Sequence, residues 1–198
     1  MLTQHAQVRV VLICPGATDY ALQHRVQGTL AVPLNAQGEQ EVQQMVQQLQ
    51  PLGLQALYAA VGPAAQQTAQ ALGKALGLRV RKLGKLNNLD WGLWQGMQID
   101  EIRQMHPKVY RHFRRHPEEV CPPEGETLGE LAQRASGVVR RILKRHRGEV
   151  IGIVAPEPLR SVIRHLLGAG DWGDLWRANC DHGTWLELEV VPEQLSKG

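Results

Sequence analysis

Cysteine is scarce in this chain of 198 residues, and its three copies, Cys14, Cys121 and Cys180, are far apart. They form no C-x-x-C pair, so we expect neither a disulfide framework nor a cysteine-based zinc cluster. Cysteines used in this way are typical of a reducing compartment, and the sequence therefore predicts a cytoplasmic protein.

Long apolar runs are also missing. The first apolar stretch, residues 8–14, is interrupted by Arg9 and stops at Pro15, and the six residues before it are mostly polar. A membrane-spanning helix needs about 20 apolar residues, so no signal peptide, membrane span or membrane partner is expected.

Aromatic residues make up only 5% of the chain, and the net charge is small, at +3. The aromatics are not interleaved with basic residues as in single-strand binding surfaces, so nucleic-acid binding is not expected. Basic residues nevertheless gather in two runs, for which solvated helix faces are the leading interpretation and docking of an acidic protein the alternative. The runs comprise Arg103, Lys108, Arg111, Arg114 and Arg115, then Arg134, Arg140, Arg141, Lys144, Arg145 and Arg147.

Common cofactor and metal motifs are absent as well. The histidines show no H-E-x-x-H spacing, and His112 with His116 lies in a basic run where exposed placement is expected. Gly16 alone after a strand is no dinucleotide fingerprint, and there is no P-loop lysine pattern. The sequence implies no cofactor and no metal.

What the sequence does contain is an alternation of buried strands and amphipathic helices in a chain of single-domain size, 1–198. Strands are predicted at residues 8–14, 54–60, 78–81, 150–154 and 184–191. Helices are predicted from the glutamine-rich segment to residue 53, and at 63–76, 127–147 and 159–167, with two short helices divided at His106-Pro107. Thr127 and Glu130 have capping-box spacing.

This order predicts an α/β fold: a three-layer α/β/α sandwich with a mostly parallel central sheet. Sites in such sheets lie beyond the carboxyl ends of the strands. The segments to inspect are therefore residues 14–18, 59–64 and 155–158.

Six short motifs occur in a characteristic order. They are residues 25–28 (Arg-Val-Gln-Gly), 33–38 (Pro-Leu-Asn-Ala-Gln-Gly), 67–69 (Gln-Thr-Ala), 91–96 (Trp-Gly-Leu-Trp-Gln-Gly), 122–127 (Pro-Pro-Glu-Gly-Glu-Thr) and 179–187. Through them the chain resembles the histidine phosphatase superfamily, which is phosphoglycerate-mutase-like, over about residues 8–188. The resemblance implies a phosphatase or phosphomutase fold.

The residues that would carry this family's chemistry are different here. The family's first strand ends in Arg-His-Gly-Glu-Thr, where the histidine is the nucleophile, and the matching residues are Cys14 and Pro15 in place of the arginine and histidine. A nearby family asparagine matches Ala21, and the second phosphate-binding arginine matches Ala64. Pro15 has no side-chain nitrogen that could attack phosphorus.

The acid and the second histidine of the family are replaced in the same way. The Leu-x-Glu glutamate matches Asn88, whose amide cannot supply a proton, and the histidine of Ser-His-Gly matches Pro156. The alignment after Pro156 is ambiguous by one residue. The resemblance thus implies a degenerate member with no intact catalytic residue, and Glu157 at the pocket rim would repel phosphate.

We expect a residual pocket, whose lining should include Thr18, Arg25, Trp91, Trp94, Glu157 and Arg160. Loop and helix anchoring is nevertheless the leading interpretation for Thr18, Arg25 and Arg160, and core and rim packing for most of the tryptophans. Cys14 as a replacement nucleophile is the less favoured interpretation, because a cysteine phosphatase needs an arginine about six positions on, where Tyr20 stands.

Three hypotheses of function follow. The first is a catalytically inactive domain that binds or regulates a protein or small molecule. The second is a divergent phosphatase of small phosphorylated metabolites with rebuilt chemistry, using Cys14 or Glu157. The third is a scaffold subunit, such as a homodimer, that buries Trp172 and Trp176 against its partner.

Overall fold

The computed structural model describes residues 7–192; the amino-terminal residues 1–6, which entered the signal-peptide argument, lie outside that range. Its strands are β1 (Val8–Ile13), β2 (Ala56–Ala59), β3 (Val80–Lys82), β4 (Val150–Val154) and β5 (Trp185–Val190). Its α-helices are α1 (Asp19–Leu22), α2 (Ala36–Leu49), α3 (Pro63–Leu76), α4 (Ile99–Met105), α5 (Pro107–Arg115), α6 (Leu128–Arg145), α7 (Leu159–Leu166) and α8 (Leu175–Ala178). Short 3-10 turns follow α2 and lie at Gly92–Trp94 and Pro117–Glu119.

The five strands form one sheet in the order β3-β2-β4-β1-β5. All neighbouring pairs are parallel except β1 with β5, which is antiparallel at the edge. The apolar, β-branched sequence of β1 fits its interior position, where it is hydrogen-bonded on both sides. The predicted mostly parallel sheet is confirmed.

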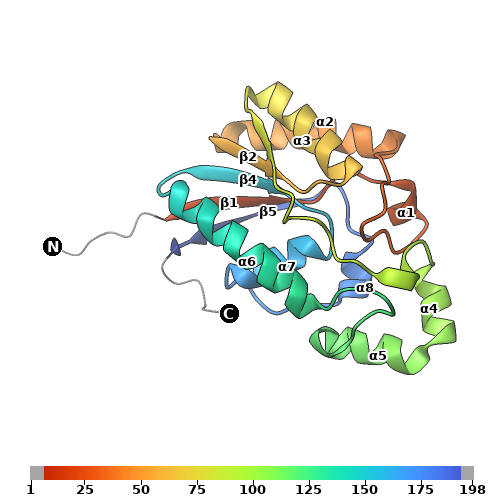
Figure 1. The fold of residues 1–198 in the computed structure, drawn as a ribbon. Helices are drawn as coiled ribbons and strands as arrows, with labels where there is room; N and C mark the ends of the chain where they lie inside the picture. The colour runs from red at the N-terminus through yellow and green to blue at the C-terminus, as the bar shows by residue number, and fades with distance from the viewer. Residues whose placement is uncertain (1–6, 193–198) are drawn as a thin grey trace.

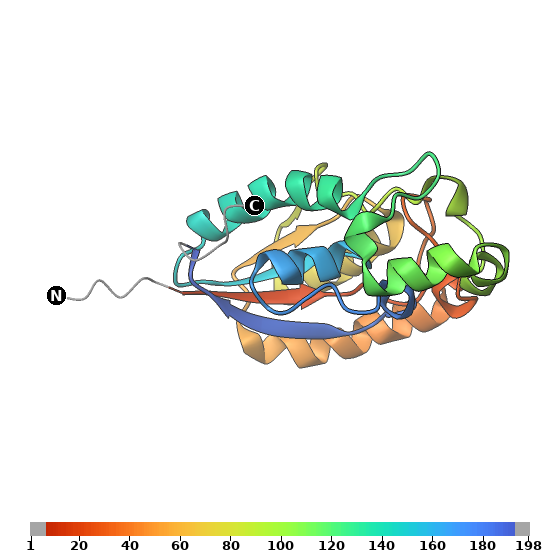
Figure 2. The same cartoon turned by 90° about the horizontal axis from the view of Figure 1, so that it is seen from below.

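Helices cover both faces of this sheet (Figures 1 and 2). Helices α2 and α3 pack together on one face, while α6 and α7 pack together on the other, and α4 and α5 lie beyond one end. Each covering helix turns its apolar stripe inward; in α6 this stripe includes Leu131, Ala135, Val138 and Ile142. The architecture is the three-layer sandwich that the sequence predicts.

The helix boundaries follow local chemistry. Thr127 caps α6 by accepting a hydrogen bond from the Glu130 amide, while the Glu130 carboxylate accepts from the Thr127 amide, as the capping-box spacing predicts. Helix α3 begins at Pro63 and ends at Gly77, which is left-handed with φ of 69°. The break between α4 and α5 falls at His106, the residue before a proline.

Some details differ from the sequence prediction. The short helices α1 and α8 were not predicted, because four residues are too few to show a periodic pattern. The second and third strands begin two residues later than predicted, since their first residues belong to the turns that precede them.

A cluster of aromatic rings fixes the end of the molecule that carries α5. Trp176 stacks on Tyr110 with ring centroids 5.1 Å apart and on Trp91 at 5.2 Å, and it contacts Trp94 and Phe113. Its indole nitrogen donates to the Tyr110 carbonyl oxygen at 3.1 Å. The expectation that Trp176 is free to pack on a partner subunit is therefore wrong.

None of the helices within residues 7–192 combines the length and apolar character that crossing a membrane requires. The cytoplasmic location and the single-domain organisation of residues 1–198 stay predictions.

Candidate functional site

Three parallel strands end side by side. Ile13 of β1 and Ala59 of β2 both pair with Val154 of β4, so the segments that follow these strands meet at one edge of the sheet. A small cavity of about 30 Å³ lies there. We call it the strand-end pocket; it is lined by Cys14, Pro15, Gly16, Thr18, Ala21, Gln27, Ala64, Asn88, Pro156, Glu157, Asn179, Asp181 and His182.

The structure thus brings together every position at which the family resemblance implies a replaced catalytic residue. Pro15 and Pro156 line the pocket from the ends of β1 and β4, and Ala21 and Ala64 line it from α1 and α3. None of these four side chains titrates, carries charge or donates a hydrogen bond. They shape the pocket without supplying a reactive group.

The loop after β1 has its backbone amides already in use. The Gly16 amide donates to Oγ1 of Thr68 at 3.2 Å, and the Ala17 amide donates to Oε2 of Glu41 at 2.9 Å. A Cβ atom on Gly16 would lie 2.3 Å from the Gly38 carbonyl oxygen, so the loop packs directly on the first turn of α2. These amides do not form an open cradle for an anion.

Cys14 is buried, at 2% exposure, and its thiol donates to the Asp181 carbonyl oxygen at 3.2 Å. Burial raises the pKa of the Cys14 thiol far above its ordinary value, and the nearby Glu157, Asp181 and Glu41 raise it further against the opposing effect of Arg160. The thiol is therefore held in its protonated, unreactive form.

Asn88 takes part in three hydrogen bonds within the pocket wall. Its Nδ2 donates to the carbonyl oxygens of Gly28 at 3.2 Å and Glu157 at 2.8 Å, and its Oδ1 accepts from the Leu159 amide at 3.3 Å. The Asn88 side chain thereby connects the loop before the 3-10 turn at Gly92–Trp94 to the start of α7. This is a positioning role.

Glu157 and Arg160 form a buried ion pair, with 2.6 Å between Arg160 Nε and Glu157 Oε1. The Glu157 carboxylate also accepts from the Ser161 amide at 3.0 Å, and Arg160 reaches Thr184 Oγ1 at 3.2 Å and Asp181 Oδ2 at 3.4 Å. The expectation of a Glu157 at the rim is corrected, because its side chain is only 3% exposed. Arg160 is withheld from the pocket lining by these internal partners.

Thr18 lines the pocket as predicted, and it also caps α1 by accepting from the Ala21 amide at 3.1 Å. Arg25 does not line it, since its guanidinium donates to the Gly96 carbonyl oxygen at 2.6 Å and anchors that loop. The expectation that Trp91 and Trp94 face the pocket is not met either. They are 0% and 4% exposed and belong to the aromatic cluster around Trp176.

Sequence reasoning missed the polar groups that the segment after α8 brings into the pocket. Asn179, Asp181 and His182 all line it. The Nδ1 atom of His182 lies 2.9 Å from the Glu41 carboxylate, so a carboxylate orients the imidazole. The sequence marks residues 179–187 only as a motif of the scaffold. The place of this motif in the family order is the one sequence signal that could indicate its nearness to the pocket.

A larger cavity of about 300 Å³ adjoins the strand-end pocket. Glu157 and Asp181 line both, and the lining of the larger cavity adds Arg160, Arg164, Arg177, Asp174 and Trp172. Trp172 stacks on His165, with ring centroids 4.0 Å apart. This second space is large enough for a small ligand, in contrast to the strand-end pocket.

Comparison with known proteins agrees with this architecture. Among curated proteins, the phosphoserine phosphatase 1 of Hydrogenobacter thermophilus is 26% identical over 184 residues, covering 92% of this chain and 87% of that protein. A probable phosphoglycerate mutase of Salmonella arizonae is 24% identical over 168 residues, covering 84% and 78%.

Solved structures show the same fold at low identity. A mycobacterial glucosyl-3-phosphoglycerate phosphatase in complex with VO3 is 22% identical, with a TM-score of 0.79 and coverage of 90% of this chain and 91% of that one. A structure titled mycobacterial hydrolase 1 gives a TM-score of 0.81, with 22% identity and coverage of 92% and 91%. The model of the histidine phosphatase superfamily (branch 1) matches residues 10–196, and this chain belongs to that superfamily.

Proposed function

We propose that this domain keeps the histidine phosphatase scaffold but acts by binding, and that it transfers no phosphoryl group through a histidine after β1. One observation carries the proposal: Pro15 and Pro156, which match the two family histidines, face the same pocket. A covalent phosphoenzyme needs a nucleophilic nitrogen at the first of these positions.

The charge of the strand-end pocket supports the same conclusion. Its lining carries the carboxylates of Glu157 and Asp181 and no lysine or arginine. Phosphoryl transfer depends on positive charge around the equatorial phosphate oxygens, and two carboxylates would repel them. Arg160 contacts both of these carboxylates, and its charge is taken up by the two ion pairs.

The adjoining cavity of about 300 Å³ is where we place the binding function. Arg160 is paired there with Glu157 and Asp181. The lining also carries Arg164 and Arg177 with one further carboxylate, Asp174, and Trp172 adds an aromatic ring. Such a lining suits a small molecule that combines a carboxylate or phosphate with a planar group.

A divergent phosphatase is the second candidate, and the relatives favour it over an inactive domain because the curated matches named above are a phosphatase and a probable mutase. His182 supports it independently. Its Nδ1 is bound to Glu41, and no residue within 7–192 hydrogen-bonds its Nε2, which leaves that nitrogen able to act as nucleophile or base. Cys14, the nucleophile considered from the sequence, is disfavoured by its burial.

The third hypothesis, a scaffold subunit or homodimer, loses Trp176 as its contact residue, because that ring is 2% exposed within its own chain. Sedimentation of the purified chain tests what remains of it. A strictly monomeric profile would contradict self-association.

The test of the main proposal is hydrolysis of p-nitrophenyl phosphate and of a panel of phosphorylated metabolites from mildly acidic to mildly alkaline pH. A genuine histidine phosphatase, the variant His182→Asn and the exposed control His112→Asn are assayed alongside. We expect no turnover by the wild-type chain. Turnover that survives repurification, disappears in His182→Asn and persists in His112→Asn would establish the divergent phosphatase instead.

A further inference from the structure

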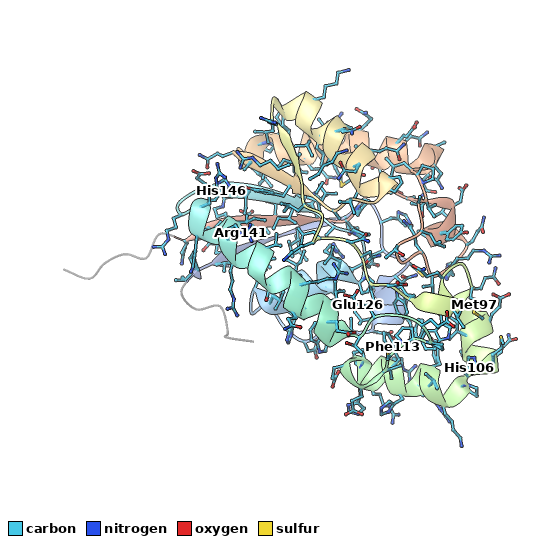
Figure 3. The ribbon with its side chains drawn as sticks, viewed as in Figure 1. Met97, His106, Phe113, Glu126, Arg141 and His146 are labelled. Carbon is cyan, nitrogen blue, oxygen red and sulfur yellow. The ribbon has the colours of Figure 1, made fainter. Side chains whose placement is uncertain are left out.

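A third cavity, of about 440 Å³, lies between the edge strand β3 with its following loop and the carboxyl-terminal half of α6. We call it the β3-α6 groove. Figure 3 shows Arg141 and His146 at the end of α6 that is remote from Phe113 and His106. The groove shares no lining residue with the strand-end pocket or with the cavity beside it.

Positive charge dominates this groove. Five of its lining residues are cationic and none is acidic: Arg81, Lys82, Lys85, Arg141 and Arg145. Within residues 7–192, the side chains of all but Arg81 form no ion pair or hydrogen bond. Like charges gathered around one cavity repel each other, and a bound anion relieves that repulsion.

Neighbouring carboxylates do not neutralise the groove, because they are already engaged. Glu126 is paired with Arg134, whose guanidinium also donates to the Lys85 carbonyl oxygen. Glu149 is paired with His146, 2.6 Å from its Nδ1. The cations of the groove are thus left for a ligand.

Arg81 is held in place by a chain of hydrogen bonds. Its Nη1 donates to the Tyr58 hydroxyl oxygen at 2.8 Å, and its guanidinium lies over the Tyr58 ring, 5.5 Å from the centroid. The Tyr58 oxygen is 2.7 Å from His146 Nε2, and since Arg81 donates to that oxygen, we assign the Tyr58 hydroxyl as the hydrogen-bond donor to His146. His146 then carries its proton on Nδ1 and donates to Glu149.

This chain fixes one guanidinium before any ligand arrives, so that less conformational entropy is lost on binding. A planar guanidinium matches two phosphate oxygens at once, which a lysine cannot do. Arg81 is therefore suited to orient a phosphate group, while the four other cations around it add charge.

The floor of the groove is apolar. Leu83, Val138 and Ile142 line it, and the last two are largely buried side chains of α6. A ligand that used the whole groove would present several negative charges to the rim and an uncharged, flat or apolar part to the floor. The volume is that of a small-molecule site, whereas stable docking of a protein needs a broader surface.

We propose that the β3-α6 groove binds a nucleoside di- or triphosphate, with its phosphates at Arg81 and the four other cations. Its base and ribose lie against Leu83, Val138 and Ile142. RNA is less suitable, because the Arg81 guanidinium already lies over the single aromatic ring of the groove, Tyr58, and occupies its stacking face.

Calorimetric titration of the full chain with ADP and ATP tests this proposal. The double variant Arg141→Glu/Arg145→Glu is compared with Arg111→Glu/Arg115→Glu, which reverses two exposed arginines on α5, outside the groove, with the same change in net charge. We expect the Kd for ATP to rise at least about tenfold in the first variant. In the second it should change by less than about twofold.

Tripolyphosphate, adenosine and a poly-glutamate peptide complete the experiment. We expect tripolyphosphate and adenosine each to bind more weakly than ATP. The proposal is overturned by an undetectable affinity for ATP, by equal weakening in both double variants, or by tripolyphosphate binding as tightly as ATP. Tighter binding of the peptide than of ATP would overturn it in favour of an acidic protein partner.

Discussion

Arg160 Nε lies 2.6 Å from Glu157 Oε1, and the two side chains are 10% and 3% exposed. Glu157 lines both the strand-end pocket and the larger cavity beside it, and Arg160 lines the larger one. Glu157 follows Pro156 in the segment before α7, and Arg160 stands on the first turn of that helix. The cation that could attract a phosphate is thereby bound to a carboxylate of its own chain.

Replacing Glu157 by Ala should destabilise the fold by about 3 kcal/mol, because it leaves the Arg160 charge buried without its main partner. Glu157→Gln should cost less, since the amide oxygen can still accept from Arg160, although the NH2 group then replaces the oxygen that accepts from Ser161. Urea unfolding measures both, with Glu118→Ala at an exposed site as the control. A Glu157→Ala chain as stable as the wild type would show that the pair contributes nothing.

The Cys14 thiol should resist alkylation in the folded chain while the exposed Cys121 is labelled. The physical reason is burial, which raises the pKa of Cys14 and keeps the reactive thiolate from forming. Peptide mass spectrometry after iodoacetamide treatment measures the two sites separately, and urea serves as the control that exposes both. Equal labelling of both cysteines in the native chain would contradict the placement of Cys14.

The raised pKa of Cys14 also predicts a pH dependence of stability. Above the ordinary thiol value of 9.0, the unfolded chain releases this proton while the folded chain retains it, so the free energy of unfolding falls as the pH rises. Cys14→Ala should reduce this alkaline slope, with Cys121→Ala as the control. An unchanged slope in Cys14→Ala would mean that other groups cause it.

Trp176→Ala should destabilise the fold by about 4 kcal/mol, because it removes a buried ring from the centre of the aromatic cluster. It also leaves the Tyr110 carbonyl oxygen without its indole donor. Thermal or urea unfolding measures the loss, and Trp176→Phe should recover part of it by keeping a ring in contact with Trp91. A loss below that of an exposed substitution such as Leu93→Ala would contradict the central position of this ring.

Much of the fold could be predicted from the sequence, because its signals are local. The apolar run of β1, which is rich in β-branched residues, the capping box of Thr127 and Glu130, and Pro107 after His106 each act within a few residues. The strand-end location of the pocket then followed from the parallel sheet alone.

The rest depends on contacts between distant segments. His182 and Glu41 are separated by 141 positions, and no local pattern in either segment predicts their contact. Trp91 and Trp94 lie on a connecting segment, and whether such rings face a pocket or the core is decided by Trp176, far along the chain. The Glu157 and Arg160 pair, three positions apart, is the contact that spacing could have indicated.

Trapping a phosphoenzyme tests the central claim most directly. The purified chain is mixed with p-nitrophenyl phosphate, quenched in alkaline denaturant and weighed by intact mass spectrometry, with a genuine histidine phosphatase treated in parallel. We predict that the control gains the mass of one phosphoryl group and that this chain gains none. A chain that gains that mass, with the phosphoryl group on His182 or any other histidine, would contradict the claim that this domain acts by binding alone.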